Sequence, residues 1–143
     1  MIIRNFRPDD SERLTEIWYN VSITAHSFIP SEMWDAHKEE LRNKYLPSSE
    51  TWVAEENSEL LGFISVLGNY IGGLFIAENR QGMGIGTKLI EQVKLLKRQL
   101  YVGVYSKNEG ARKFYGKNGF SYLNEEVQTE TGEIIINMTY EKE

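Results

Sequence analysis

The sequence predicts an α/β domain in which helices flank a mixed, largely antiparallel sheet. Three observations support this fold class. The apolar residues alternate between strand-like and helix-like spacing in the order β-α-α-β-β-β-α-β-α-β-β. The 143 residues are enough for one domain, since single domains cluster at about 100–150 residues. No repeat, low-complexity tract or linker interrupts the chain, so we expect residues 1–143 to form one domain.

The N-terminal half is expected to contain a strand, two helices and a β-hairpin. In the first helix, Leu14, Ile17 and Val21 recur at helical spacing. The expected elements are a strand over 1–7, a helix over 8–21, an irregular connection over 22–29, a helix over 31–46 with Ser31 as its N-cap, and hairpin strands over 51–55 and 61–67. Pro47, Ser48 and Ser49 are expected to end the second helix.

The C-terminal half alternates strands and helices. The expected elements are strands over 70–76, 100–105, 120–123 and 134–140, a helix that follows the glycines at 82–86, and a helix over 109–118. The apolar stripe of the first of these helices consists of Ile85, Leu89, Val93 and Leu96. Gly119 is expected to end the helix over 109–118, because glycine readily adopts the left-handed backbone conformation found at helix ends. Gly72 and Gly73 lie within a strand, where glycines mark a bulge or a close backbone approach.

The composition excludes several classes of chemistry. Cysteine is absent, which removes disulfides, thiolate nucleophiles and cysteine-type zinc sites. His26 and His37 are too few for a three-histidine metal site, and we expect no metal. No apolar run approaches the ~18 residues of a membrane span, and the charged start of the chain does not resemble a signal peptide. We therefore expect a cytoplasmic protein with no membrane partner.

Charge is unevenly distributed along the chain, whose net charge is −5. This acidic balance argues against nucleic acid as a partner. Residues 80–117 carry nine Lys and Arg against two Glu, a net +7, whereas the rest of the chain carries seven against nineteen, a net −12. A basic segment in an acidic protein points to a local anionic ligand. A solvated helix face would produce the same pattern, and charge alone does not separate the two.

A glycine-rich loop, Gln81-Gly82-Met83-Gly84-Ile85-Gly86-Thr87, joins a strand to a helix. Such a loop binds anions, because free backbone N–H groups and the helix dipole meet at a point that glycine leaves open to a phosphate. Two nucleotide-binding patterns do not fit. The Walker A loop needs a glycine before its lysine, and Thr87 precedes Lys88 in this chain. The G-x-G-x-x-G fingerprint begins at Gly82 but has Thr87 in place of its third glycine.

Two motifs fit another family better. Gln81, Gly84 and Gly86 form Q-x-x-G-x-G, which resembles the [RQ]-x-x-G-x-[GA] signature of the GNAT superfamily of N-acetyltransferases. Residues 108–120 match the N-x-x-A-x-x-[FL]-Y-x-x-x-G-F element of the same superfamily and begin 22 residues after Gly86. The order of elements agrees along the chain, although the first 50 residues agree only as a strand and two helices. The resemblance implies a GNAT-like acyl-CoA N-acyltransferase fold.

The resemblance also implies acetyl-CoA as co-substrate. Backbone N–H groups of the loop would hold its pyrophosphate, and a strand edge would pair with the pantetheine amides. The implied cofactor-binding residues are Leu74, Phe75 and Ile76 in the strand, Gln81, Gly82, Met83, Gly84, Ile85, Gly86 and Thr87 in the loop, and Asn108 and Arg112 beyond it. Core packing is an alternative role for the strand side chains, and Arg112 is equally well explained as a surface arginine.

The implied catalytic residue is Tyr115, as general acid. A phenol has a pKa of about 10 and a thiol a pKa of about 8.5, so the tyrosine stays protonated at neutral pH and can protonate the leaving thiolate. A buried tyrosine that only packs against the sheet is the structural alternative.

The acceptor is expected to be a primary amine of a small molecule, a peptide or a protein lysine. Because a lysine-like amine has a pKa of about 10.4, a base or a water chain must remove its proton. His26, in a connection expected to face the acceptor, and Tyr70, at the start of a strand, are the candidate substrate-binding residues. Glu55 and Glu78 are weaker candidates, and His37 is expected to be structural.

Another class of function stays open, namely a non-catalytic acyl-CoA-binding domain for sensing or interaction. Tyr115 argues against this alternative, because a binding domain does not need the general acid. A nucleotide-dependent oxidoreductase fails on the motif spacing. Monomer and homodimer are both compatible with the sequence, and neither the acceptor nor the acyl-chain length follows from it.

Overall fold

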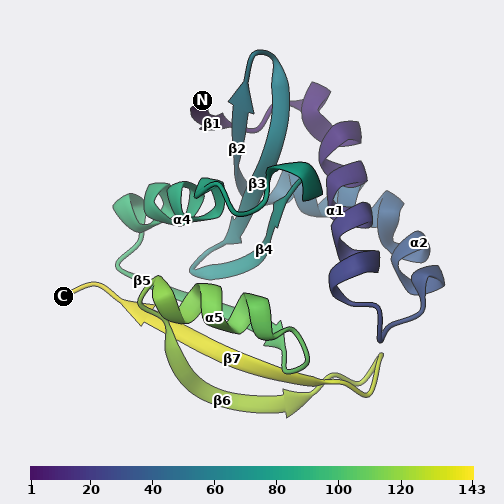
Figure 1. Ribbon diagram of the computed structural model, residues 1–143, viewed down its shortest axis with the longest axis vertical. Helices are drawn as coiled ribbons and strands as arrows, with labels where there is room; N and C mark the ends of the chain where they lie inside the picture. The colour runs from purple at the N-terminus through teal and green to yellow at the C-terminus, as the bar shows by residue number, and fades with distance from the viewer.

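The computed structural model describes residues 1–143 and confirms the predicted α/β architecture (Figure 1). Seven strands form one sheet in the order β1-β2-β3-β4-β5-β7-β6. Neighbouring strands are antiparallel except β4 and β5, which are parallel. The strands are β1 (Ile2–Asn5), β2 (Glu50–Glu56), β3 (Glu59–Leu67), β4 (Tyr70–Ile76), β5 (Gln99–Tyr105), β6 (Ser121–Val127) and β7 (Ile134–Glu141).

Helices cover both faces of this sheet. They are α1 (Ser11–Ala25), α2 (Ser31–Glu40), α3 (Leu46–Ser48), α4 (Ile85–Leu96) and α5 (Glu109–Lys117). A 3-10 turn, Pro8–Asp10, precedes α1, and a π-helical turn, Leu41–Tyr45, joins α2 to α3. None of the helices is both long enough and apolar enough to cross a membrane.

The hydrophobic core has two parts, one on each face of the sheet. Buried side chains of α4 and α5 pack with strands β3, β5 and β7 in one part, and those of α1, α2 and α3 pack with β2 and β3 in the other. Val53 and Ala54 of β2 belong to different parts, since successive side chains of a strand point to opposite faces. Strand β3 is buried along its length between its two ends, as expected for a strand covered on both faces.

Strands β4 and β5 pair at only two positions, Tyr70 with Tyr101 and Ile71 with Val102. Beyond Ile71 the two strands separate, and the rest of β4 pairs on one side only, with β3. The other pairs of neighbouring strands pair at four or more positions. The β4 backbone over residues 72–76 therefore has an edge without a strand partner inside the sheet.

A bulge lies at the point where the strands separate. In the pairing with β3, Ser65 lies opposite Gly73 and the next residue lies opposite Ile71, so Gly72 is the extra residue of β4. A Cβ atom at Gly73 would come within 2.6 Å of the Phe75 ring, which explains the second glycine. The bulge predicted from the two glycines is confirmed.

Two predictions about the first helices are wrong. Helix α1 continues to Ala25, so residues 22–25 are helical instead of irregular. Ser22 is fully buried, and the packing of this last turn outweighs its weak helix propensity. Ser31 is the first helical residue of α2 and not its N-cap, because the extended backbone of Pro30 (ψ 138°) lets the helix begin directly after it.

Two further predictions fail near the surface. Strand β6 does not end at Leu123 but continues to Val127, because its exposed polar residues pair with β7 along the edge of the sheet. Leu96 is 53% exposed, and Ile90 takes its place in the buried stripe of α4. A pattern of apolar spacing does not detect an edge strand whose side chains are exposed throughout.

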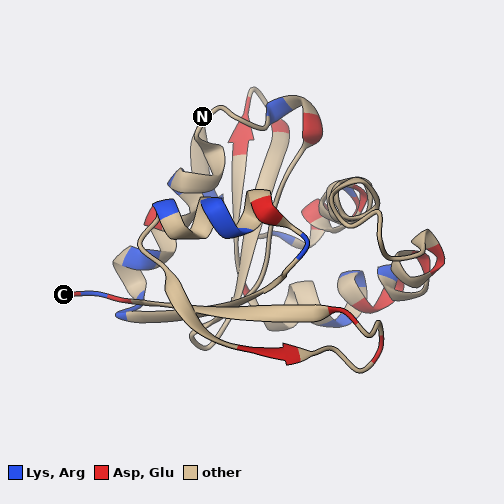
Figure 2. Ribbon diagram, turned by 60° about the horizontal axis from the view of Figure 1, so that its bottom comes forward, with Lys and Arg blue, Asp and Glu red and all other residues tan.

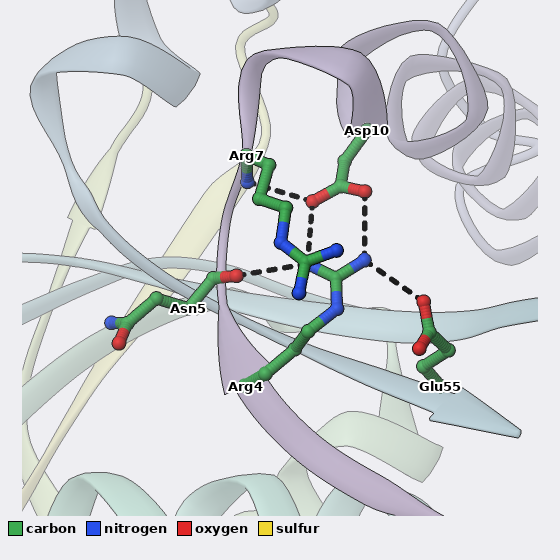
Figure 3. Close-up of polar contacts among 5 residues, drawn as sticks. All are labelled: Arg4, Asn5, Arg7, Asp10 and Glu55. Atoms are coloured by element: carbon green, nitrogen blue, oxygen red, sulfur yellow. Dashed lines mark hydrogen bonds and ion pairs between the residues drawn. The ribbon is translucent and has the colours of Figure 1, made fainter. Parts of the chain in front are cut away.

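An ion cluster fastens β1 to β2 and to the start of the first helix (Figure 3). Arg4 donates hydrogen bonds to both carboxylate oxygens of Asp10 at 2.9 Å and to Glu55 at 3.0 Å. The backbone N–H of Arg7 donates to Asp10 at 2.7 Å. Burial raises the pKa of Asp10, but the hydrogen bonds from Arg4 and Arg7 outweigh it and hold the pKa below its usual value. Asp10 therefore stays ionised in the folded protein at neutral pH.

Replacing Asp10 with alanine should destabilise the fold by about 3 kcal/mol, because a largely buried arginine loses its main partner. Since the folded-state pKa lies below the unfolded value of about 3.9, the contribution is complete above about pH 5 and disappears as the pH falls through the folded pKa. Urea unfolding of the protein and of Asp10→Ala at decreasing pH measures both effects. The matched control, Asp9→Ala at an exposed position, should change the unfolding free energy by less than about 0.5 kcal/mol. A difference between the protein and Asp10→Ala that does not shrink at low pH would contradict the assigned role.

Candidate active site

A cleft of about 860 Å³ opens where β4 and β5 separate. Its lining comes from β4, the glycine-rich loop, β5 and α5, together with residues of α1, α2 and β6. The glycine-rich loop follows Ile76 at the C-terminal end of β4, and Tyr70 lies at the other end of the strand. Six residues of extended strand span about 20 Å, so the cleft has two well-separated ends.

The glycine-rich loop forms an open helix N-terminus. Gly82 and Gly84 have positive φ angles of 79° and 81°, and no atom lies within 4 Å of the position that a Cβ would take on either residue. Gly86 has a different role, because a Cβ there would lie 3.1 Å from the Phe114 ring of α5. The first N–H groups of the 12-residue helix α4 have no partner within the helix, so the loop has the chemistry of an anion site.

Side chains next to the loop hold it in place. The Gln81 amide donates a hydrogen bond to the Ile76 carbonyl at 3.0 Å and so ties the loop to the end of β4. Arg80 pairs with Glu59 of β3 at 3.1 Å. Arg80 and Lys117 are the two cationic residues in the cleft lining. Much of the predicted basic segment therefore lies outside the cleft.

The β4 residues Leu74, Phe75 and Ile76 line the cleft and also pack in the core. Leu74 and Ile76 pack against the part of the core that contains α4, and Phe75 packs against the other. Their backbone belongs to the edge of β4 that has no partner in β5. Core packing and ligand pairing are therefore compatible, because side chains and backbone point in different directions.

Tyr115, on α5, lines the cleft and is 5% exposed. Its ring contacts Phe114 and Phe120 at centroid distances of 5.2 Å. Burial, with a smaller contribution from Tyr70, raises the pKa of Tyr115 above the ordinary phenol value. The hydroxyl group therefore keeps its proton at neutral pH, and it can donate a hydrogen bond or a proton to a group in the cleft.

His26 follows α1 and contacts the loop before α5. Its Nε2 lies 3.1 Å from the Asn108 side-chain nitrogen, and the Asn108 oxygen accepts the Ala111 backbone N–H at 3.1 Å. The Asn108 nitrogen is thus the donor to His26, so Nε2 accepts and Nδ1 carries the proton. Burial lowers the pKa of His26 to about 4, which keeps the imidazole neutral. Its Nδ1 is buried without a partner, so His26 has no free lone pair with which to act as a base.

The part of the cleft beside β5 and β6 has aromatic walls and one carboxylate. The rings of His26 and Tyr105 lie 4.8 Å apart, and the Tyr105 hydroxyl donates to Gln128 at 2.8 Å. Sequence reasoning missed Tyr105, Gln128 and Glu126, all of which line the cleft. Gln128 and Glu126 come from the β6 edge and its hairpin, and no local pattern marks them.

Other candidate residues lie outside the cleft lining. Met83 is 63% exposed, and Arg112 does not reach the lining. Glu55 pairs with Arg4, and Glu78 is exposed at the start of a 3-10 turn. No group of three or more His, Asp or Glu side chains is placed to hold a metal ion. His37 contacts Glu130 in the β6–β7 hairpin at 2.8 Å, which agrees with a structural role.

Comparisons with known proteins agree with this geometry. The family model of the acetyltransferase (GNAT) domain matches residues 47–122. The peptidyl-lysine N-acetyltransferase YiaC of Escherichia coli is 31% identical over 131 residues, which cover 91% of this chain and 90% of the relative. The peptidyl-lysine N-acetyltransferase YjaB of Salmonella typhimurium is 32% identical over 141 residues, which cover 96% of this chain and 97% of the relative. The solution structure of apo YjaB from Escherichia coli has a TM-score of 0.86 at 27% identity and covers 100% of both chains.

The family model spans more than half of the chain, and the relatives align along nearly all of it. Both motifs of the sequence lie in the cleft, Q-x-x-G-x-G at its glycine loop and the second motif through Asn108 and Tyr115. The chain therefore belongs to the GNAT family of acetyltransferases and is an acetyl-CoA-dependent N-acetyltransferase.

Proposed function

We propose that this enzyme transfers the acetyl group of acetyl-CoA directly to a lysine side chain of a peptide or protein, with Tyr115 as the general acid. The observation that carries the proposal is the buried, protonated Tyr115 hydroxyl in a cleft between a glycine-lined helix N-terminus and an aromatic pocket. Two relatives of similar length are named peptidyl-lysine N-acetyltransferases, which supports lysine among the possible primary amines.

The glycine-rich loop and β4 fit the acyl donor. Backbone N–H groups between Gln81 and Thr87 bind the pyrophosphate, because Gly82 and Gly84 leave room for it. The unpaired edge of β4 hydrogen-bonds the pantetheine amides as an added strand would. When bound, acetyl-CoA supplies an acetyl thioester, whose carbonyl carbon bonds to the amine nitrogen as the carbon–sulfur bond breaks.

Tyr115 provides the proton that the departing sulfur takes up. Its raised pKa keeps the hydroxyl protonated until negative charge develops on the sulfur. The lysine ammonium group first loses one proton to water. The neutral nitrogen attacks, becomes positively charged and loses a second proton, which restores the neutral tyrosine, so the enzyme itself gains or loses no net proton. A backbone N–H on the free edge of β4 stabilises the charge on the thioester oxygen.

His26 and Tyr70 contribute to the acceptor side in different ways. The neutral His26 ring forms part of the aromatic wall and positions Asn108 at the start of α5. The Tyr70 hydroxyl lies beside Gly103, 3.1 Å from the position of a Cβ on that glycine, and so faces the same end of the cleft. Both residues act by shaping the acceptor pocket, and neither removes the proton from the amine.

The direct test is thiol release from acetyl-CoA in the presence of a peptide with one lysine. The same peptide with norleucine in place of lysine is the blank. Acetylation of the lysine peptide above this blank supports the proposal. Hydrolysis of acetyl-CoA at the same rate with both peptides would contradict transfer to lysine.

Substituting Gly84 with aspartate should weaken acetyl-CoA binding by about tenfold or more, because a carboxylate would face the pyrophosphate. Asn is the matched control, since Asn and Asp have almost the same size and both tolerate a positive φ. We expect Gly84→Asn to bind several times more tightly than Gly84→Asp in calorimetric titrations. Equal affinities for the two variants would place the phosphates elsewhere.

Replacing Tyr115 with phenylalanine should lower kcat by about 10²- to 10⁴-fold, because the leaving sulfur loses its proton donor. The Kd for acetyl-CoA should stay within about twofold, since the ring and its packing are retained. Tyr140→Phe is the matched control, because Tyr140 packs on Phe120 but does not line the cleft. A kcat close to that of the unmodified enzyme would remove Tyr115 from the acid role.

His26 should stay neutral as the pH is lowered and become protonated only near pH 4, because burial disfavours its charged form. Nitrogen NMR of the imidazole also reports the tautomer, which we expect to carry the proton on Nδ1. A His37→Ala variant leaves one imidazole to assign. Protonation near the ordinary value of about 6.5 would show that the ring is solvated and free to act as a base.

A further inference from the structure

The cleft carries its few charges in different parts of its lining. Glu126 of β6 is the only Asp or Glu in its lining, and Arg80 and Lys117 are the only cations. Arg80 directly precedes the glycine-rich loop, and Lys117 lies one helical turn beyond Phe114, whose ring approaches Gly86. The cations therefore gather at the end that fits the pyrophosphate.

Glu126 lies on the other side of the separated strands, beyond β5. It pairs across the strands with Ile135 of β7, which also lines the cleft. A Cβ atom at Gly103 would meet Ile135 at 3.0 Å and the Tyr70 hydroxyl at 3.1 Å. The Tyr70 hydroxyl and the strand pair that carries Glu126 thus meet at one place, beside Gly103.

Two carboxylates of the neighbouring β6–β7 hairpin have side-chain partners, whereas Glu126 has none. In the β6–β7 hairpin, Glu130 contacts His37 and Glu133 contacts Lys107. Glu126 forms no ion pair within the chain and is exposed to the cleft. Figure 2 shows the acidic segments at the end of β6 and in the hairpin that follows it.

Tyr70 connects this carboxylate with the reacting region. Burial and the charge of Glu126 raise the pKa of Tyr70. Tyr70 in turn contributes to the raised pKa of Tyr115. Glu126, Tyr70 and Tyr115 all line the same cleft, so a group bound between Glu126 and Tyr70 shares this cleft with the Tyr115 hydroxyl.

We propose that Glu126 binds the ammonium group of the incoming acceptor and makes the enzyme selective for cationic alkylamines. The proposal rests on the proposed function and names the residue that selects its substrate. An alkylammonium group is charged at neutral pH, and its hydrocarbon stem suits the aromatic walls formed by Trp34 and Tyr105. A peptide lysine and a free diamine share this chemistry.

Glu126 acts in binding and not in proton removal. A carboxylate next to an ammonium group favours the charged form, so it attracts the acceptor but does not help it lose its proton. Removal of the carboxylate should therefore raise the KM for a cationic amine and leave kcat within about twofold. An effect on kcat alone would be the signature of a base.

A binding experiment tests the proposal without relying on turnover. The enzyme, saturated with CoA, is titrated with a short peptide that contains one lysine or one norleucine. We expect the intact enzyme to prefer the lysine peptide by about fivefold, the upper range for one solvent-exposed ion pair. Glu126→Gln should bind the two peptides equally. The control, Glu125→Gln, should keep the preference, because Glu125 is the next residue on β6 and lies outside the cleft lining.

Kinetics distinguish the source of the amine. Glu126→Gln should raise the KM for the lysine peptide or for 1,5-diaminopentane by about fivefold, and Glu126→Lys by more. The KM of the intact enzyme should also rise with ionic strength, and that of Glu126→Gln should change less. A higher kcat/KM for the lysine peptide identifies a peptide or protein lysine as the acceptor, and a higher kcat/KM for 1,5-diaminopentane identifies a free diamine.

Two results would overturn the assignment of Glu126. The first is an unchanged preference of Glu126→Gln for the lysine peptide. The second is an equal loss of this preference in Glu125→Gln, which would show that the general negative charge of β6 attracts the peptide. A third result separates the two proposals. If the enzyme prefers the lysine peptide only when Glu126 is present, but acetylates neither the peptide nor the diamine, the binding site is supported and the proposed function is contradicted. The two proposals can therefore fail separately.

Discussion

The limited pairing of β4 with β5 is the constraint on which the rest of the molecule depends. After two residue pairs the strands separate, and the bulge at Gly72 lies at the point of separation. This separation does two things at once. It leaves a backbone edge on β4 for a ligand to pair with, and it opens the cleft that α5 and the glycine-rich loop face. A sheet with full pairing at this position would have neither feature.

Burial sets the protonation states on which the chemistry depends. The same cause, removal from water, acts in opposite directions on an acid and a base: it raises the pKa of Tyr115 and lowers the pKa of His26. Both groups are therefore uncharged at neutral pH. Tyr115 remains a proton donor, while His26 serves as a fixed wall and as the acceptor of a hydrogen bond from Asn108.

Few charged side chains line the cleft. Most of the basic side chains between residues 80 and 117 lie on exposed helix faces or in ion pairs, such as Lys97 with Glu50. The cleft lining itself contains two cations, Lys117 and Arg80, and one carboxylate, Glu126, and Arg80 pairs with Glu59. These charges suit the proposed binding of an anionic donor and a cationic acceptor. The buried Arg4–Asp10 pair lies outside this cleft and contributes to stability.

The order of elements, the bulge at the two glycines and the glycine-rich loop before α4 could be predicted from the sequence. Each of these depends on residues that are contiguous or a few turns apart, where spacing and backbone freedom are visible along the chain. The contacts across the cleft, in contrast, follow from the tertiary fold. His26 contacts Asn108, 82 residues away, and Glu126 reaches the cleft that Tyr70 lines through the pairing of an exposed edge strand with β7. Such meetings depend on strand register and helix packing, and no local pattern of residues encodes them.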